Sequence, residues 1–206
     1  MEQDNPFADS FSDSAAFAAL PRLTGLALSP DGTRLVATMQ QPDDKGARYT
    51  SSIWQVPLRA GAGAGATGGG GEPIRLTRSD KGETAPAFLP DGSLLFVSAR
   101  PDPDAGNGCG YDNGDESAIW VLPPVGEPQV FAACPGGLGL AAVARESGTV
   151  IAYGRRLAWT SADEDDSKRR TTRKDRRITA ILHTGMPIRY WDHELGEESP
   201  RLLRLD

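Results

Sequence analysis

The fold is decided by the stretch Leu26-Ala-Leu-Ser-Pro-Asp-Gly-Thr-Arg-Leu-Val-Ala-Thr38, which recurs as Thr84-Ala-Pro-Ala-Phe-Leu-Pro-Asp-Gly-Ser-Leu-Leu-Phe-Val-Ser98. Both copies hold Pro-Asp-Gly between two apolar runs. Proline fixes φ early in a turn, aspartate bonds the neighbouring backbone, and glycine accepts a positive φ. Each stretch therefore predicts an antiparallel hairpin closed by a tight turn.

The flanking segments repeat in the same order. An Ile-Trp strand follows each hairpin, first as Ser52-Ile-Trp-Gln-Val-Pro57 and then as Ser117-Ala-Ile-Trp-Val-Leu-Pro123. A Glu-Pro turn with a short strand comes next, as Glu72-Pro-Ile-Arg-Leu-Thr77 and Glu127-Pro-Gln-Val-Phe131. Four antiparallel strands that recur at a fixed period are typical of β-propeller blades.

A third copy is weaker and incomplete. Gly139–Ala144 and Thr149–Tyr153 flank Glu146-Ser-Gly148, which replaces Pro-Asp-Gly, and the next matching strand is delayed to Pro200–Leu205. No residues remain after it for a fourth strand. The sequence thus predicts an all-β fold, a partial β-propeller of about three four-stranded antiparallel blades with the last blade incomplete. The expected divisions are an N-terminal tail at 1–21 and blades at 22–80, 81–135 and 136–206.

Two segments stand apart from the predicted strands. Residues 14–20 are rich in alanine and suit either a helical turn or two, or a loosely docked tail, which we favour. Residues 161–177 join an acidic block to a basic block and contain almost no apolar side chain. Such a segment buries too little to offset its ordering entropy, which predicts a disordered insertion in the third blade. A partner-docking or nucleic-acid-binding arm over Lys168–Arg177 is the alternative.

Composition narrows the class of protein. The formal charge of −6 argues against a general nucleic-acid binder, and 24 glycines with 16 prolines suit a turn-rich β protein. Cys109 and Cys134 are expected to be reduced thiols. The N-terminus is acidic and lacks the basic start and apolar core of a secretory signal, which predicts a cytoplasmic protein. The lack of long apolar runs predicts that no segment spans a membrane.

No group of residues carries a recognisable catalytic or binding pattern. The Gly-rich run 60–71 leads into a strand and not a helix, so we expect a flexible loop and no phosphate site. His183 and His193 lie apart, and aromatic packing is the better explanation for the stretch that holds His193. The loop between the second and third strands of blade two has calcium-type ligands in an unsuitable spacing: Asp102, Asp104, Asn107, Asp112, Asn113 and Asp115. We therefore assign no catalytic, cofactor-binding or metal-binding residue, and no cofactor.

Tryptophans are expected to fill gaps between the blades. Trp54, Trp120 and Trp159 lie in or beside predicted strands. Large aromatic side chains at such positions stabilise contacts between neighbouring sheets.

These repeats resemble TolB-type propellers. The resemblance is carried by Ser29-Pro-Asp-Gly-x-x-Leu35-Val36, Leu89-Pro-Asp-Gly-x-x-Leu95-Phe96 and the Ile-Trp strands. The start at 23–32, the charged insertion and Arg189-Tyr-Trp-Asp-His-Glu-Leu195 look like the N-terminal propeller of prolyl-oligopeptidase-family serine peptidases of the acylaminoacyl-peptidase kind. The resemblance spans residues 20–206 and carries over no site residue.

The resemblance implies a role. In that family a propeller, usually of seven blades, caps a C-terminal α/β-hydrolase domain and admits only short peptides to its Ser, Asp and His. We expect a gating, substrate-selecting segment that is inactive alone, with the hydrolase domain and peptide substrates as partners. Open sheet edges also make a homo-oligomer possible. The alternative is a free-standing TolB-like scaffold for protein–protein binding.

Overall fold

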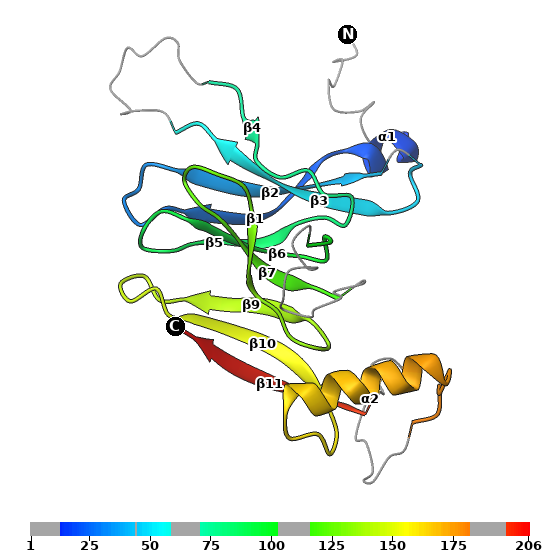
Figure 1. The fold of residues 1–206 in the computed structure, drawn as a ribbon. Coiled ribbons are helices and arrows are strands. Elements are labelled where there is room, and N and C mark those ends of the chain that lie inside the picture. Colours follow the sequence, from blue (N-terminus) through cyan, green and yellow to red (C-terminus); the bar gives the residue numbers. More distant parts are fainter. Residues whose placement is uncertain (1–12, 44, 59–70, 103–115, 182–196) are drawn as a thin grey trace, which may run out of the picture.

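Three antiparallel sheets lie one above another in the computed structural model, which describes residues 13–43, 45–58, 71–102, 116–181 and 197–206 (Figure 1). The first two sheets have four strands each in sequence order, and the third has three. Sheet 1 comprises β1 (Arg22–Leu28), β2 (Leu35–Pro42), β3 (Tyr49–Val56) and β4 (Ile74–Arg75). Sheet 2 comprises β5 (Thr84–Phe88), β6 (Leu94–Ser98), β7 (Ala118–Leu122) and β8 (Gln129–Ala132). Sheet 3 comprises β9 (Leu138–Val143), β10 (Val150–Leu157) and β11 (Glu198–Leu205). The expected all-β, propeller-like arrangement is confirmed.

The turn between the first two strands contains a glycine of the same conformation in all three sheets. Its glycine has a positive φ each time, 74° at Gly32, 82° at Gly92 and 73° at Gly148. In the first turn the Asp31 carboxylate accepts hydrogen bonds from the Thr33 backbone N–H at 3.1 Å and from its hydroxyl at 2.8 Å. A side chain that satisfies the turn backbone and a glycine free to adopt positive φ explain why this short motif marks each hairpin.

The first turn is one residue longer than the second, which changes the alignment of the repeats. The Ser29 N–H donates to the Arg34 carbonyl, whereas the Leu89 N–H donates to the Ser93 carbonyl. Counted from these bonds, Leu35 occupies the place of Leu94. The motif spacing had matched Leu35 with Leu95, and the structure corrects that match. One residue of shift in a strand moves every side chain to the opposite face of the sheet.

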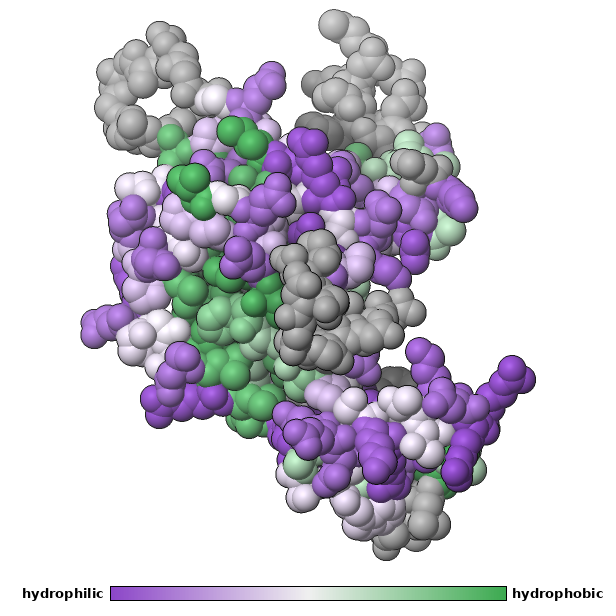
Figure 2. All heavy atoms as spheres, viewed as in Figure 1, coloured by the Kyte–Doolittle hydropathy of each residue, from purple (hydrophilic) through white to green (hydrophobic). Residues whose placement is uncertain are grey.

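Two apolar clusters join the sheets into one stack. Sheets 1 and 2 meet around Val36, Ile53, Phe96 and Trp120, all buried. Sheets 2 and 3 meet around a second buried set made of Leu95, Ile119, Leu138, Val150 and Ala152. Figure 2 shows hydrophobic side chains gathered at mid-height of the stack on the face toward the viewer. Burial of apolar surface between sheets is therefore the main source of stability.

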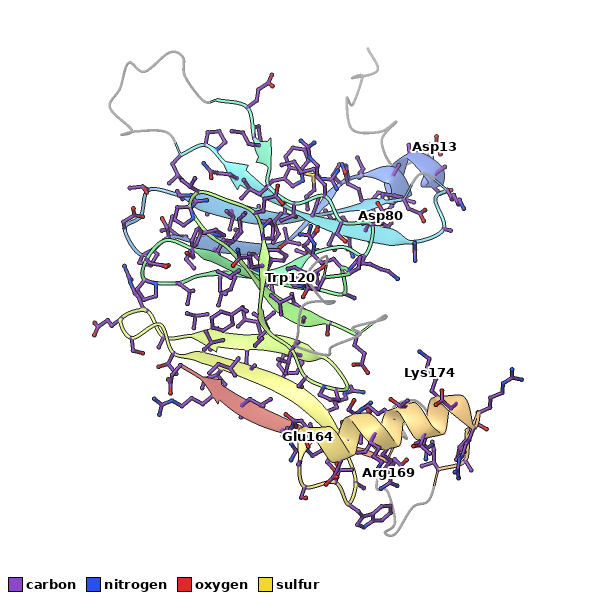
Figure 3. All side chains as sticks on the ribbon, in the orientation of Figure 1. Asp13, Asp80, Trp120, Glu164, Arg169 and Lys174 are labelled. Carbon is purple, nitrogen blue, oxygen red and sulfur yellow. The ribbon has the colours of Figure 1, made fainter. Side chains whose placement is uncertain are left out.

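The tryptophans differ in their surroundings. Trp120 is 1% exposed and lies in the middle of the stack, as expected (Figure 3). Trp54 is half-buried on sheet 1. Trp159 is 60% exposed, has a positive φ of 62° and lies under the Arg169 guanidinium, 5.4 Å from the ring centre. The expectation that Trp159 fills a gap between blades is wrong, because it sits in the turn after β10.

A buried glutamate ties the first two sheets together. The Glu83 carboxylate accepts hydrogen bonds from the Thr77 hydroxyl at 3.0 Å and the Ser79 N–H at 2.8 Å. The Glu83 N–H donates to the Ser51 carbonyl of sheet 1 at 2.9 Å. Burial raises the pKa of Glu83 above its ordinary value of 4.5. The connection between β4 and β5 is thus fixed to β3 by polar contacts.

The charged segment 161–177 is not disordered. It forms helix α2 (Asp163–Asp175), which lies beside the end of sheet 3 (Figure 1). Four acidic residues occupy its first turn and Arg173 and Lys174 its last, an order that suits the helix dipole. Ion pairs to sheet 3, and not apolar burial, offset the entropy that the segment loses when it becomes ordered. The composition of the segment alone does not reveal these ion pairs.

The N-terminal tail contains a short helix. Helix α1 (Ser14–Ala19) starts at Asp13, whose side chain accepts hydrogen bonds from the Ala15 and Ala16 N–H groups at 2.8 and 3.2 Å. None of its residues is buried. The helical alternative for residues 14–20 is therefore correct, although the helix packs little.

Candidate functional site

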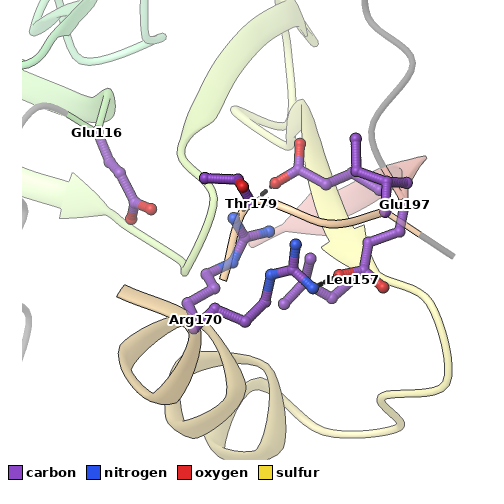
Figure 4. Close-up of a pocket in the computed structure, with 8 residues that line it drawn as sticks. Glu116, Leu157, Arg170, Thr179 and Glu197 are labelled. Carbon is purple, nitrogen blue, oxygen red and sulfur yellow. Dashed lines mark hydrogen bonds and ion pairs between the residues drawn. The ribbon is translucent and has the colours of Figure 1, made fainter. Parts of the chain in front are cut away.

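Charged side chains from α2 converge on the start of β11 and the end of β10, where they line a cavity of about 360 Å³ (Figure 4). Figure 4 shows Arg170 reaching from α2, with Glu116 on the opposite side and Glu197 above. The lining residues are Glu116, Leu157, Arg170, Arg173, Thr179, Ile181, Glu197 and Glu198. Five of these eight side chains are charged.

The anchor of this cluster is Asp166, which is buried on the inner side of α2. Its carboxylate accepts from the Leu157 N–H at 2.8 Å and pairs with the Arg170 Nε at 2.8 Å. A buried carboxylate is tolerated only when hydrogen bonds and an opposite charge replace its water. Asp166 therefore fixes the helix to β10.

Two adjacent glutamates receive the arginines of α2. Glu197 pairs with Arg169 at 3.0 Å and with Arg173 at 2.6 Å. Glu198 pairs with Arg170 at 2.6 Å. Burial acts to lower the pKa of Arg170, but hydrogen bonds to Asp166 and Glu198 outweigh it and the pKa is raised. Both guanidinium groups that line the cavity are thus already neutralised.

Asp163 completes the network at the first turn of α2. It hydrogen-bonds to Arg156 and, at 2.7 Å, to Arg201 of β11. These bonds, the one from Arg156 foremost, lower the pKa of Asp163. Each acid of the cluster has a basic partner, so the network is suited to docking the helix more than to proton transfer.

The residues that line the cavity do not include the nucleophile–base pair of a serine hydrolase. Among its lining residues the only hydroxyl belongs to Thr179, and none is a histidine or cysteine. A hydrolytic site of the serine type requires a nucleophile next to a base. The residues that line the cavity therefore form no hydrolytic site of the serine type.

A second cavity, of about 320 Å³, lies between sheets 1 and 2 beside the β4–β5 connection. Its wall is polar and rich in hydroxyl groups, and comprises Arg48, Tyr49, Thr50, Ser51, Asp80, Lys81, Gly82, Thr84, Val97, Ser98, Ala99 and Ser117. Ser98 is engaged, since its hydroxyl donates to the Gly82 carbonyl at 2.7 Å. This wall also brings no serine next to a histidine.

Most residues considered from the sequence lie outside the described part of the chain. This holds for His183, His193, Cys109, the run 60–70 and every acidic or amide residue of the proposed loop except Asp102. Within the described residues no group of three or more His, Cys, Asp or Glu side chains has metal-binding geometry. Cys134 is buried, and this burial raises the pKa of its thiol.

Sequence analysis missed the arginine cluster of α2. The signal was present, because Arg169, Arg170 and Arg173 follow Asp166 at spacings of three, four and seven, which place them on neighbouring faces of a helix. Their acceptors, Glu197 and Glu198, lie on a strand far along the chain. Only the fold brings the two sets together.

Comparison with known proteins supports the architecture. No protein-family model matches the sequence, and neither does any curated protein. The chain resembles part of a solved peptidase. The structure of Pyrococcus horikoshii acylaminoacyl peptidase matches with a TM-score of 0.55 and 12% identity, over 92% of this chain. This chain spans only 24% of that peptidase, and at this identity the likeness shows a shared fold. No helix in the described ranges is long and apolar enough to cross a membrane.

Proposed function

We propose that this chain is a non-catalytic propeller segment of a serine peptidase, which gates the entry of short or N-acylated peptides. The observation that supports this role is the match of the sheet stack, over 92% of the chain, to an acylaminoacyl peptidase. The repeat motifs, the Ile-Trp strands and the charged insertion of the third sheet, which carry the resemblance to that peptidase family, support the same role. A cytoplasmic location is part of this proposal.

In this role the chemistry belongs to a partner. The serine, aspartate and histidine lie in an α/β-hydrolase domain, and the sheets restrict which substrates reach them. The restriction is steric, since a narrow entry excludes folded proteins but not short peptides.

The first test is to read the DNA downstream of codon 206, both in the same reading frame and in the adjacent one. The proposal expects one of them to encode a Gly-x-Ser-x-Gly hydrolase domain. An unrelated neighbouring gene after a true stop codon contradicts it and favours the free-standing scaffold.

A kinetic test uses that hydrolase domain and chromogenic acyl-aminoacyl and dipeptidyl anilides. The chain alone should give no turnover. Joined to the hydrolase domain, it should lower the cleavage of a long polypeptide relative to a short anilide. Turnover by the purified chain alone that resists a serine-directed phosphonate would overturn the proposal.

A further inference from the structure

Each sheet of the stack has two different faces, and the repeat defines them. The rear face of sheet 2 carries Leu94, Phe96 and Trp120 and packs on sheet 1. Its front face carries Leu95 and Ile119 and packs on sheet 3. These positions transfer to the other sheets when residues are counted from the hydrogen bond that closes each turn, because the second and third strands then pair in the same register.

The front face of sheet 3 is apolar and uncovered. In sheet 1 the equivalent positions hold Val36 and Ile53, both buried. In sheet 3 they hold Ile151 and Leu202, and Leu202 is 75% exposed. Beside them Tyr153 lies over Gly139, where an added Cβ would meet the tyrosine ring. A position that is buried in two repeats is therefore left open in the third.

The rear face of sheet 1 is open in the same way. Leu28 occupies the place of Phe88, and the two are 57% and 7% exposed. Leu26, next to Leu28 on the same face of β1, is exposed as well. The half-buried Trp54 occupies the place of the fully buried Trp120.

We propose that a second copy of this chain covers both faces, with the front face of sheet 3 on the rear face of sheet 1 of its partner. This contact continues the interface that the chain already makes twice. The front face of sheet 1 packs on the rear face of sheet 2, and the front face of sheet 2 packs on the rear face of sheet 3. The two faces that stay open are one front face, on sheet 3, and one rear face, on sheet 1. The chain is therefore complementary to itself in a head-to-tail sense.

Two copies make a closed assembly. A head-to-tail contact closes into a ring or continues as a filament, depending on its rotation. Three sheets from each copy give six, which lies within the range of blade numbers of closed propellers. Closure by a two-fold axis covers both of these open sheet faces in both copies.

Charge does not oppose this contact. The front face of sheet 3 carries two arginines in the described strands, and both have acidic partners. Arg155 lies 4.0 Å from Glu198, and Arg204 lies 3.0 Å from Asp206. Helix α2 contacts the end of sheet 3 near Leu157, so it leaves the centre of the face uncovered.

Light scattering and sedimentation velocity on the full 206-residue chain test the proposal. The expected mass is twice 21.9 kDa. Leu28→Asp and Leu202→Asp should each give a monomer that remains folded, as judged by an unchanged circular dichroism spectrum. Each substitution should raise the dissociation constant of the dimer at least 100-fold. Val125→Asp is the control, because Val125 is 92% exposed and belongs to neither face.

Mixing the two variants separates a head-to-tail contact from other arrangements. A Leu28→Asp copy keeps its front face and a Leu202→Asp copy keeps its rear face, so a mixture should recover dimers through one intact contact. If the native chain is a monomer at every concentration, the proposal is overturned. A mixture that recovers no dimer also overturns it, as does a dimer that only one of the two substitutions disrupts. The result is independent of the peptidase assay.

Discussion

At the level of single residues, three glycine turns set the hairpins. Gly92 has a φ of 82° and nothing lies within 4 Å of the place of a Cβ, so its role is conformational and not steric. The Asp31 carboxylate of the matching turn accepts bonds from Ser29 first and then Thr33, which lower its pKa to about 2. These local contacts explain why Pro-Asp-Gly predicted the turns correctly.

Gly92→Ala should lower the free energy of unfolding by about 1 kcal/mol, because an L residue is strained at positive φ. Urea unfolding measures the change. Gly71→Ala is the control, since the φ of Gly71 is not in the positive region and its nearest Cβ neighbour is 3.9 Å away. Equal losses for both variants would contradict the conformational explanation.

Glu83 should make stability depend on pH in the direction opposite to most acids. Its folded pKa lies above the ordinary 4.5, so the folded state holds the proton longer than the unfolded chain. Stability then falls as pH rises from about 4.5 to the folded pKa. Thermal melts of Glu83→Gln against the native protein should show this slope reduced. An identical slope in the two proteins would rule out Glu83 as its cause.

At the level of elements, α2 shows what a composition argument leaves out. The segment lacks apolar side chains, and a disordered loop was predicted for that reason. Ion pairs to Glu197 and Glu198 hold it instead, and these acceptors come more than twenty residues after the helix. Long-range polar contacts of this kind have no local signature in a sequence.

Arg170→Ala should destabilise sheet 3 by about 2 kcal/mol, because it leaves the buried Asp166 carboxylate without its cation. Urea unfolding followed at 222 nm measures this loss together with the loss of helix. Lys174→Ala, on the same helix but exposed, is the matched control and should change little. Comparable effects of the two substitutions would show that general helix charge and not the Asp166 contact matters.

The strands were predicted far better than the helix. Apolar runs on either side of Pro-Asp-Gly located the hairpins, and the Ile-Trp motif located β3 and β7. The match of Leu35 with Leu95 was off by one, because the extra residue of the first turn is visible only in its hydrogen bonds. A motif fixes where a turn lies, but side-chain direction depends on the turn length.

At the level of the whole molecule, stability depends on the contacts between sheets. Trp120→Ala should cost about 3–5 kcal/mol, because it opens a cavity between sheets 1 and 2. Trp159→Ala removes an equally large side chain from an exposed turn and should cost far less. Thermal unfolding of the two variants measures the difference. Similar losses would mean that the stack depends little on the Trp120 cluster.

The candidate site was the least predictable part of the molecule. Sequence motifs identified no catalytic residue, and the charged cavity requires α2, β10 and β11 together. Its acids and bases lie in separate parts of the chain. A repeat reveals an architecture because it recurs, whereas a site that occurs once gives no such internal comparison.

The late position of β11 has a kinetic consequence. Sheets 1 and 2 form from neighbouring strands, but Val150 pairs with Leu205 only after the intervening residues close a long loop. Loop closure of this size slows the search for native contacts, so sheet 3 should be the last to consolidate. Truncating Leu203 to alanine should then accelerate unfolding while leaving the refolding rate almost unchanged in a chevron plot.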